Sequence, residues 1–125
     1  GGEVVASRNE MFLQKLNKAY VKRDTDTIAA SVTEDIVWTK VGNPPIHGKR
    51  QFMNAMAMME GDGTQEVMID RIITHGIHAA VEGTKRVVEA SGAVKTYAFC
   101  DIYLFNKFKD GKVKEMTSYV IQIKN

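Results

Sequence analysis

Apolar residues in the first part of the chain recur every three or four positions, which is the spacing of one buried face of a helix. Phe12, Leu16 and Tyr20 follow this spacing. Ser7 precedes them, and Glu10 stands three residues after Ser7, which is the pattern of a capping box at a helix N-terminus. The pattern therefore predicts a first helix that is capped by Ser7 and buries one face.

Three further elements are predicted before the pattern changes. Asp24 or Thr25 would cap a second, short helix. Residues 36–41, "IVWTKV", are β-branched and aromatic, which is typical of a strand. Prolines at 44–45 end that strand, because proline does not fit inside a helix or a central strand. A third helix follows, ends at the glycines of residues 61–63, and carries apolar side chains on one face: Phe52, Met56 and Met59.

The second half of the chain has the composition of long strands. They are separated by Gly76, by Ser91 and Gly92, and by Asp110 and Gly111, which are residues typical of hairpin turns. Helices followed by strands indicate an α+β domain, in which a curved antiparallel sheet carries helices on one side. We expect one domain over residues 1–125. The predicted strands are Glu66–Thr74, Ile77–Glu89, Val94–Asn106 and Lys112–Ile123.

Composition narrows the possible partners. The net charge of +2 is too small to indicate a nucleic-acid partner, and no apolar run approaches the roughly 18 residues that would span a membrane. The single cysteine, Cys100, rules out an intramolecular disulfide and favours a cytoplasmic location. His75 and His78 are expected on opposite faces of a strand, and there is no glycine-rich phosphate loop, so we expect no metal and no cofactor.

Several segments together resemble one superfamily. They are "DTDTIAASVTEDIVW" at 24–38, "GNPPIHG" at 42–48, "FCDIYLF" at 99–105 and "DGKVKEMTSYV" at 110–120. With the order of helices and strands, they are similar to the nuclear transport factor 2-like superfamily, in particular its ketosteroid-isomerase and SnoaL-like polyketide-cyclase branch. This resemblance implies a cone of three N-terminal helices packed in a strongly bent antiparallel sheet around a deep apolar pocket. It also implies a homodimer formed through the outer face of the sheet. Members of the superfamily differ in function, so the fold alone assigns none.

The resemblance allows the catalytic residues of the isomerase to be matched to positions in this sequence. Those residues are an aspartate base, a tyrosine and a protonated aspartic acid. The base position falls on Thr39 or Lys40, and neither is a carboxylate. The tyrosine position falls on Leu16, with Tyr20 one helical turn away. Only the acid is matched, at Asp101. Steroid isomerisation by that mechanism is therefore not expected.

Asp101 is also singled out by its own strand, which is apolar on both faces. A carboxylate there must be paired, hydrogen-bonded or protonated, because burying it alone costs several kcal/mol. A protonated acid could donate a hydrogen bond to a ligand oxygen. The alternative is a purely structural aspartate, tied to Lys40, an arginine or a tyrosine hydroxyl. The candidate catalytic residues are Asp101, Lys40 and Tyr20.

The predicted function is that of a pocket protein that binds a small, largely apolar, oxygen-bearing molecule. Isomerase, cyclase and dehydratase are the reactions considered; the alternative is a non-catalytic ligand-binding or dimerisation module. His47 lies directly before the predicted third helix, in a loop that closes the pocket mouth in the family. A histidine at such a corner more often caps or packs a turn than transfers protons, so a structural role is favoured for His47. The expected ligand-binding residues are Trp38, Leu16, Phe52, Met56, Tyr97, Phe99, Tyr103, Met116 and Ser118.

Overall fold

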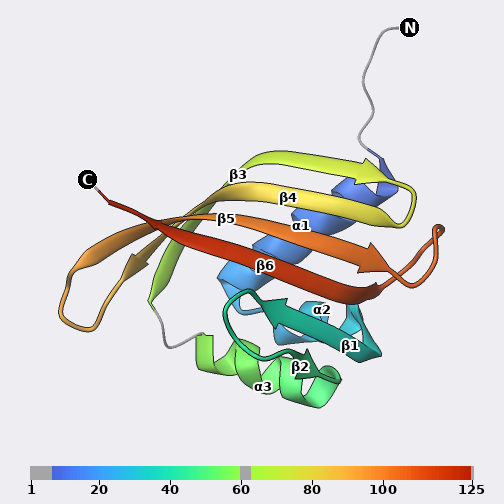
Figure 1. The fold of residues 1–125 in the computed structure, drawn as a ribbon, viewed down its shortest axis with the longest axis horizontal. Helices are drawn as coiled ribbons and strands as arrows, with labels where there is room; N and C mark the ends of the chain where they lie inside the picture. The colour runs from blue at the N-terminus through green and yellow to red at the C-terminus, as the bar shows by residue number, and fades with distance from the viewer. Residues whose placement is uncertain (1–6, 60–62, 125) are drawn as a thin grey trace, which may run out of the picture.

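The computed structural model describes residues 7–59 and 63–124, and it confirms the α+β class (Figure 1). The predicted helix end at Gly61 and Asp62 lies outside the described residues. The helices are α1 (Arg8–Lys22), α2 (Thr25–Ala30) and α3 (Lys49–Met59). The strands are β1 (Val32–Lys40), β2 (Ile46–His47), β3 (Thr64–His75), β4 (His78–Val88), β5 (Val94–Phe105) and β6 (Val113–Ile123).

The first two helices begin at polar caps. The Ser7 side chain accepts a hydrogen bond from the Glu10 backbone N–H at 3.1 Å, which confirms the predicted cap of α1. Of the two candidates for α2, Asp24 is the cap, and it accepts from the Thr27 N–H at 3.2 Å. Between the two helices, Arg23 adopts a left-handed conformation with φ of 58°, which ends α1 and turns the chain into α2.

The six strands form one sheet in the order β2-β1-β6-β5-β4-β3. All neighbouring pairs are antiparallel except β1 and β6, which are parallel, so the sheet is mixed rather than wholly antiparallel. A parallel pair needs a long crossover, and here α3 and the β3–β5 meander supply it. The sequence pattern identified the strands but contained no signal for this pairing.

The short strand β2 was not predicted. His47 pairs with Val37 of β1, and the Gly48 N–H donates to the Ile36 carbonyl at 2.7 Å. His47 itself is exposed, and Gly48 adopts a positive φ of 86° directly before α3. The stretch therefore forms a corner at the sheet edge, as the composition indicated.

The hydrophobic core lies between the inner face of the sheet and the helices. Figure 1 shows α1 crossing behind β4, β5 and β6, with α2 and α3 beside β1 and β2. Phe12 of α1 meets Phe105 of β5 edge to face at 5.6 Å between ring centroids. Trp38 of β1 meets Phe52 of α3 in the same way, also at 5.6 Å. No helix among the described residues is long and apolar enough to cross a membrane.

Candidate functional site

A cavity of about 130 Å³ lies between the helices and the inner face of the sheet. Its apolar wall includes Ile28, Trp38, Met56, Phe99, Met116 and Val120. Its polar lining comprises Asn17, Tyr20, Arg23, Lys85, Asp101 and Ser118. A volume of this size is close to that of engineered cavities, of about 150 Å³, that bind benzene, and is below the roughly 300 Å³ of pockets for drug-sized molecules. The cavity therefore suits a small ligand.

Asp101 lies on the inner face of β5, directly opposite Ser118 of β6. The Trp38 Nε1–H donates to the Ser118 Oγ at 2.9 Å. An indole can only donate, so Ser118 is the acceptor in that bond and its own hydroxyl proton is available to the Asp101 carboxylate. Three residues from β1, β6 and β5 thereby form one hydrogen-bonded chain that ends at a carboxyl group in the cavity wall.

The environment of Asp101 changes its protonation. Burial raises the pKa of the Asp101 carboxyl to about 6, because the charged form loses solvation. The hydrogen bond from Ser118 and the positive charge of Lys85 oppose this rise. Near neutral pH the group can therefore exchange a proton with a ligand at little cost, which is the property of a general acid or base.

Two tyrosine hydroxyls lie close to the same carboxyl. The Tyr20 and Tyr103 hydroxyl oxygens are 3.4 Å apart, and the Tyr20 hydroxyl also lies 3.8 Å from the Met116 sulfur. Burial raises the pKa of both hydroxyls, and the negative charge of Asp101 raises it further. Both tyrosines therefore stay protonated and can donate hydrogen bonds. Tyr20 lines the cavity together with Asp101, so two polar groups face the same space.

Some residues expected in the site lie one layer behind the cavity wall. Leu16, Phe52 and Tyr103 are fully buried or nearly so, and they are not among the described residues that line the cavity. Leu16 packs in the core one turn before Tyr20, and Phe52 supports the Trp38 ring from behind. Tyr103 is also covered, and its hydroxyl contacts Tyr20. These three residues position the wall rather than form it.

Lys40 and Tyr97, which were also expected in the site, lie outside the described cavity lining. Lys40 is at the last position of β1, partly exposed, where the chain turns and the Asn43 N–H bonds its carbonyl. It does not line the cavity, and no described ion pair joins it to Asp101. The Tyr97 ring lies beneath the Lys85 ammonium, 5.8 Å from its centroid, outside the cavity lining. Its position two residues before Phe99 places it toward the rim of the sheet.

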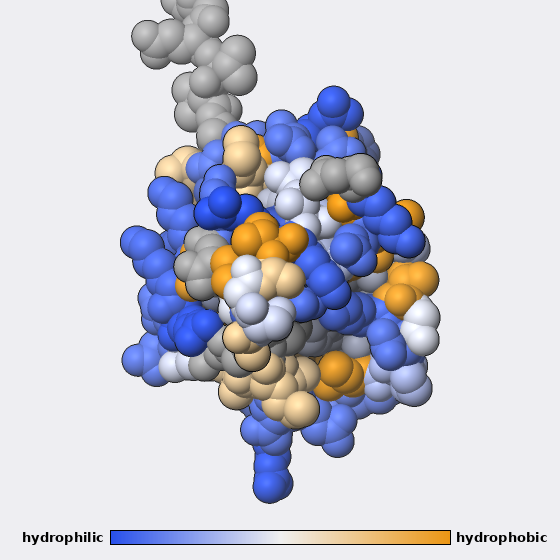
Figure 2. Space-filling view, turned by 90° about the vertical axis from the view of Figure 1, so that its left-hand side faces the viewer, coloured by the Kyte–Doolittle hydropathy of each residue, from blue (hydrophilic) through white to orange (hydrophobic). Residues whose placement is uncertain are grey.

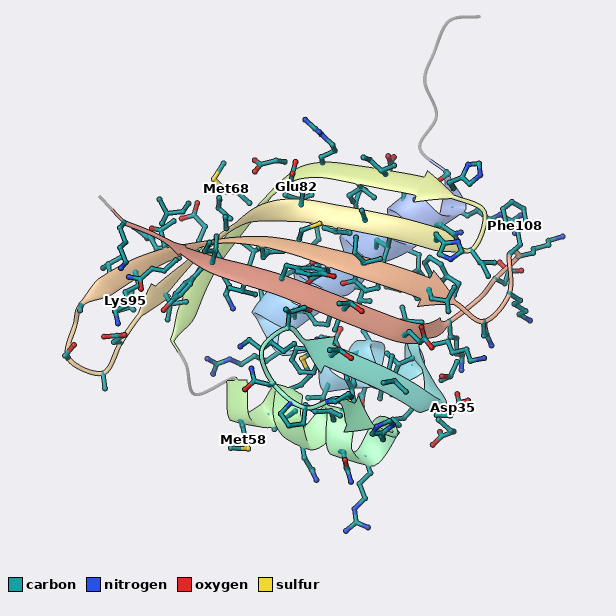
Figure 3. All side chains as sticks on the ribbon, viewed as in Figure 1. Asp35, Met58, Met68, Glu82, Lys95 and Phe108 are labelled. Atoms are coloured by element: carbon teal, nitrogen blue, oxygen red, sulfur yellow. The ribbon has the colours of Figure 1, made fainter. Side chains whose placement is uncertain are left out.

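Sequence reasoning missed two charged residues of the lining, Arg23 and Lys85. The signal for Lys85 was present, because it occupies an inward position in the alternation of β4 with Val81, Gly83 and Val87. Arg23 stands three residues after Tyr20, directly after the end of α1, and it lines the cavity although it is exposed. Among the methionines of α3, Met56 lines the cavity, whereas Met58 is 82% exposed and points away from the core (Figure 3).

Other reactive groups lie outside this site. His75 and His78 pair directly across the β3–β4 turn, so the expectation of opposite faces is wrong. Across residues 7–59 and 63–124, no group of three or more histidine, cysteine or acidic side chains could hold a metal ion. Cys100 faces the opposite side of the sheet, in a groove with Tyr119 and Ile121, and burial raises the pKa of its thiol.

Comparison with known proteins assigns the family. A sequence profile of the SnoaL-like domain matches residues 13–116, so the chain belongs to the SnoaL-like family. Its overall class is that of an α+β protein with the nuclear transport factor 2-like fold. A search of curated protein sequences finds no match.

Solved structures share this fold. A nuclear transport factor 2-like protein of unknown function from Cytophaga hutchinsonii is 25% identical, with a TM-score of 0.72 over 90% of this chain and 98% of that one. An epoxide hydrolase of the LEH-like type from M. tuberculosis is 23% identical, with a TM-score of 0.73 over 89% and 80%. A candidate SnoaL-like polyketide cyclase from Shewanella denitrificans is 12% identical, with a TM-score of 0.76 over 89% and 88%.

Proposed function

We propose that the cavity binds a small, largely apolar molecule and that Asp101 and Tyr20 hold one oxygen atom of that molecule by hydrogen bonds. The observation that carries this proposal is the Asp101 carboxyl on the wall of an apolar cavity, with the Tyr20 hydroxyl lining the same space. The chain from Trp38 through Ser118 fixes the position of that carboxyl. Because the carboxyl group is already held in place, it needs little reorganisation when a ligand binds.

Acid–base chemistry at the bound oxygen is the reaction class that this arrangement favours. Isomerisation, cyclisation, dehydration and epoxide opening all place negative charge on an oxygen atom, which a neutral acid and a phenol can stabilise. The epoxide hydrolase and the candidate cyclase that share the fold are consistent with this class. Asp101 would donate or accept the proton, and Tyr20 would hold the oxygen. No second carboxylate lines the described part of the cavity, so a two-carboxylate mechanism is not proposed.

A thermal-shift comparison of wild type with Asp101→Asn tests the proposal. The probes are matched in size and differ in oxygen content: toluene, phenol, benzaldehyde and cyclohexenone. A ligand at 100 times its dissociation constant stabilises the folded state by about 2.7 kcal/mol. For a domain of this length, that raises the melting temperature by roughly 10 °C. We expect the oxygen-bearing probes to shift wild type more than Asp101→Asn, and toluene to shift both equally.

The matched control is Asp70→Asn, because Asp70 is an exposed carboxylate of β3 beside the groove on the other side of the sheet. It is expected to bind every probe as wild type does. If none of the probes shifts wild type, the cavity is only a filled part of the core and the binding proposal is wrong. A non-catalytic scaffold would then be the better assignment.

We also propose that the outer face of the sheet pairs with a second copy of the chain. Ile102, Tyr119 and Ile121 are 40%, 51% and 71% exposed on this face, which is turned toward the viewer in Figure 1. Cross-strand pairing places them on one side with Cys100 and Ala98. An apolar sheet surface of this kind is more typical of an interface than of a monomer.

A further inference from the structure

The acidic and basic residues that line the cavity lie at different depths. Of the described residues that line it, Asp101 is acidic, and Arg23 and Lys85 are basic. Asp101 is mostly shielded from solvent, whereas Arg23 is exposed. Because Arg23 both lines the cavity and reaches solvent, the cavity opens to the surface beside it. The acid therefore lies deeper in the cavity than this cation.

Arg23 is placed at this opening by the end of α1. The left-handed backbone of Arg23, with φ of 58°, ends the helix, and its N–H donates to the Ala19 carbonyl. Glycine or asparagine is the usual residue in this conformation, so an arginine here is uncommon. Among the residues that the structure describes, the Arg23 guanidinium makes no hydrogen bond or ion pair. Figure 2 shows the left-hand side of the molecule in Figure 1, where blue, hydrophilic side chains surround a smaller apolar area.

Lys85 brings a second positive charge to the cavity from β4. Its ammonium lies over the Tyr97 ring, and its charge lowers the pKa of Asp101, so its field reaches the interior. Lys85 is partly buried and already engaged, whereas Arg23 is available to a ligand. Two positive charges around one acid favour a ligand that brings a negative charge of its own.

We infer that the ligand is a small organic anion, with a carboxylate that binds beside Arg23 and an apolar body that lies against Trp38 and Phe99. This inference rests on the proposed function, because it adds a charged group to the same ligand. A guanidinium is the side chain best suited to a carboxylate, since its two parallel N–H groups match the two oxygens. The cavity volume limits the body to about the size of a benzene ring.

Calorimetric titration with three probes of equal size tests the inference. Phenylacetate is an anion, phenylacetamide is its neutral isostere, and phenethylamine is a cation. At pH 7.5 and low salt, we expect phenylacetate to bind about tenfold or more tightly than phenylacetamide. The preference should shrink as sodium chloride is raised from 20 to 300 mM, because the opening is exposed to ions.

Substitutions at the end of α1 assign the preference to one side chain. Arg23→Asn removes the charge and keeps a residue that tolerates a positive φ, so the fold is retained. We expect it to weaken phenylacetate binding to the level of phenylacetamide, and Arg23→Lys to restore part of the preference. Lys22→Asn is the matched control, because Lys22 is a neighbouring exposed cation that does not line the cavity.

Each outcome separates this inference from the proposed function. If phenylacetamide binds as tightly as phenylacetate, or if phenethylamine binds best, the anion inference is wrong while the cavity remains a binding site. If Arg23→Asn leaves the preference for phenylacetate unchanged, the assignment to Arg23 is wrong. If none of the three probes binds to wild type while phenol or benzaldehyde does, the anion inference is wrong and the proposed function stands; if those smaller probes fail as well, the proposed function is wrong.

Discussion

At the scale of single residues, the Asp101 carboxyl couples folding to pH. Its pKa is about 6 in the folded chain, against about 3.9 in an unfolded one. The folded state therefore holds the proton more tightly. The stability that this provides is complete below about pH 4 and is lost as the pH rises through 6. Two pKa units correspond to about 3 kcal/mol.

We therefore predict that Asp101→Asn gains stability relative to wild type between pH 4 and pH 7, by up to about 3 kcal/mol. Urea unfolding of both proteins across this range measures the difference. Ser118→Ala removes a hydrogen bond that lowers the pKa of Asp101, so the loss of stability with rising pH should extend to higher pH in that variant. A difference between wild type and Asp101→Asn that stays constant with pH would contradict the prediction.

The sequence predicted Asp101 for a physical reason, since a carboxylate within an apolar strand needs a special environment. The sequence could not predict that Ser118 and Trp38 form that environment. Their contacts with each other and with Asp101 depend on the register of β5 with β6 and of β6 with β1. Lys40 was considered because the isomerase base position falls on Thr39 or Lys40 and because a lysine could pair with Asp101. Its place at the strand end, where the chain turns, keeps it out of the cavity.

At the scale of elements, Gly83 allows β4 to pass close to its neighbours. A Cβ atom on Gly83 would lie 2.1 Å from the Met68 carbonyl oxygen and 3.0 Å from the Phe99 ring. Because Met68 contributes a backbone atom near the bulge in β3, the strand pair would have to move. We predict that Gly83→Ala destabilises the protein by about 1–3 kcal/mol, measured by chemical denaturation.

The control for Gly83→Ala is Thr84→Ala, the next residue of β4, which faces the other side of the sheet. It is expected to change stability far less. Binding of the cavity probes should also weaken in Gly83→Ala, because Phe99 lines the cavity. If the two variants are equally stable, a side chain at position 83 does not clash with the Met68 backbone, and the prediction is wrong.

Local signals explain which elements were predictable. Capping residues, hairpin glycines and alternating apolar residues marked three helices and the long strands, because each signal acts within a few residues of the element. The two-residue β2 is too short to carry a periodic signal, and its pairing with β1 depends on Val37. The parallel contact of β1 with β6 joins distant parts of the chain, so no local pattern could indicate it.

At the scale of the whole molecule, the outer sheet face is expected to form a dimer. We predict that light scattering after gel filtration gives twice the chain mass of 13.9 kDa. Ile121→Lys places a charge on this face, near the end of β6, and should give a monomer. Phe108→Ser is the control, because Phe108 is equally exposed but lies at the far β5–β6 turn (Figure 3). A monomeric wild type would contradict the prediction.

The parallel pairing of β1 with β6 also has a consequence for synthesis of the protein. While a ribosome extends the nascent chain, β1 cannot meet its partner until β3, β4 and β5 have been made. Trp38 and Ile36 stay uncovered on one side during that time, and an open strand edge attracts other chains. Contacts between distant segments also slow the search for the folded state. Chaperones that hold the first third of the chain would therefore matter more for the yield of this protein than for one whose strands pair in sequence order.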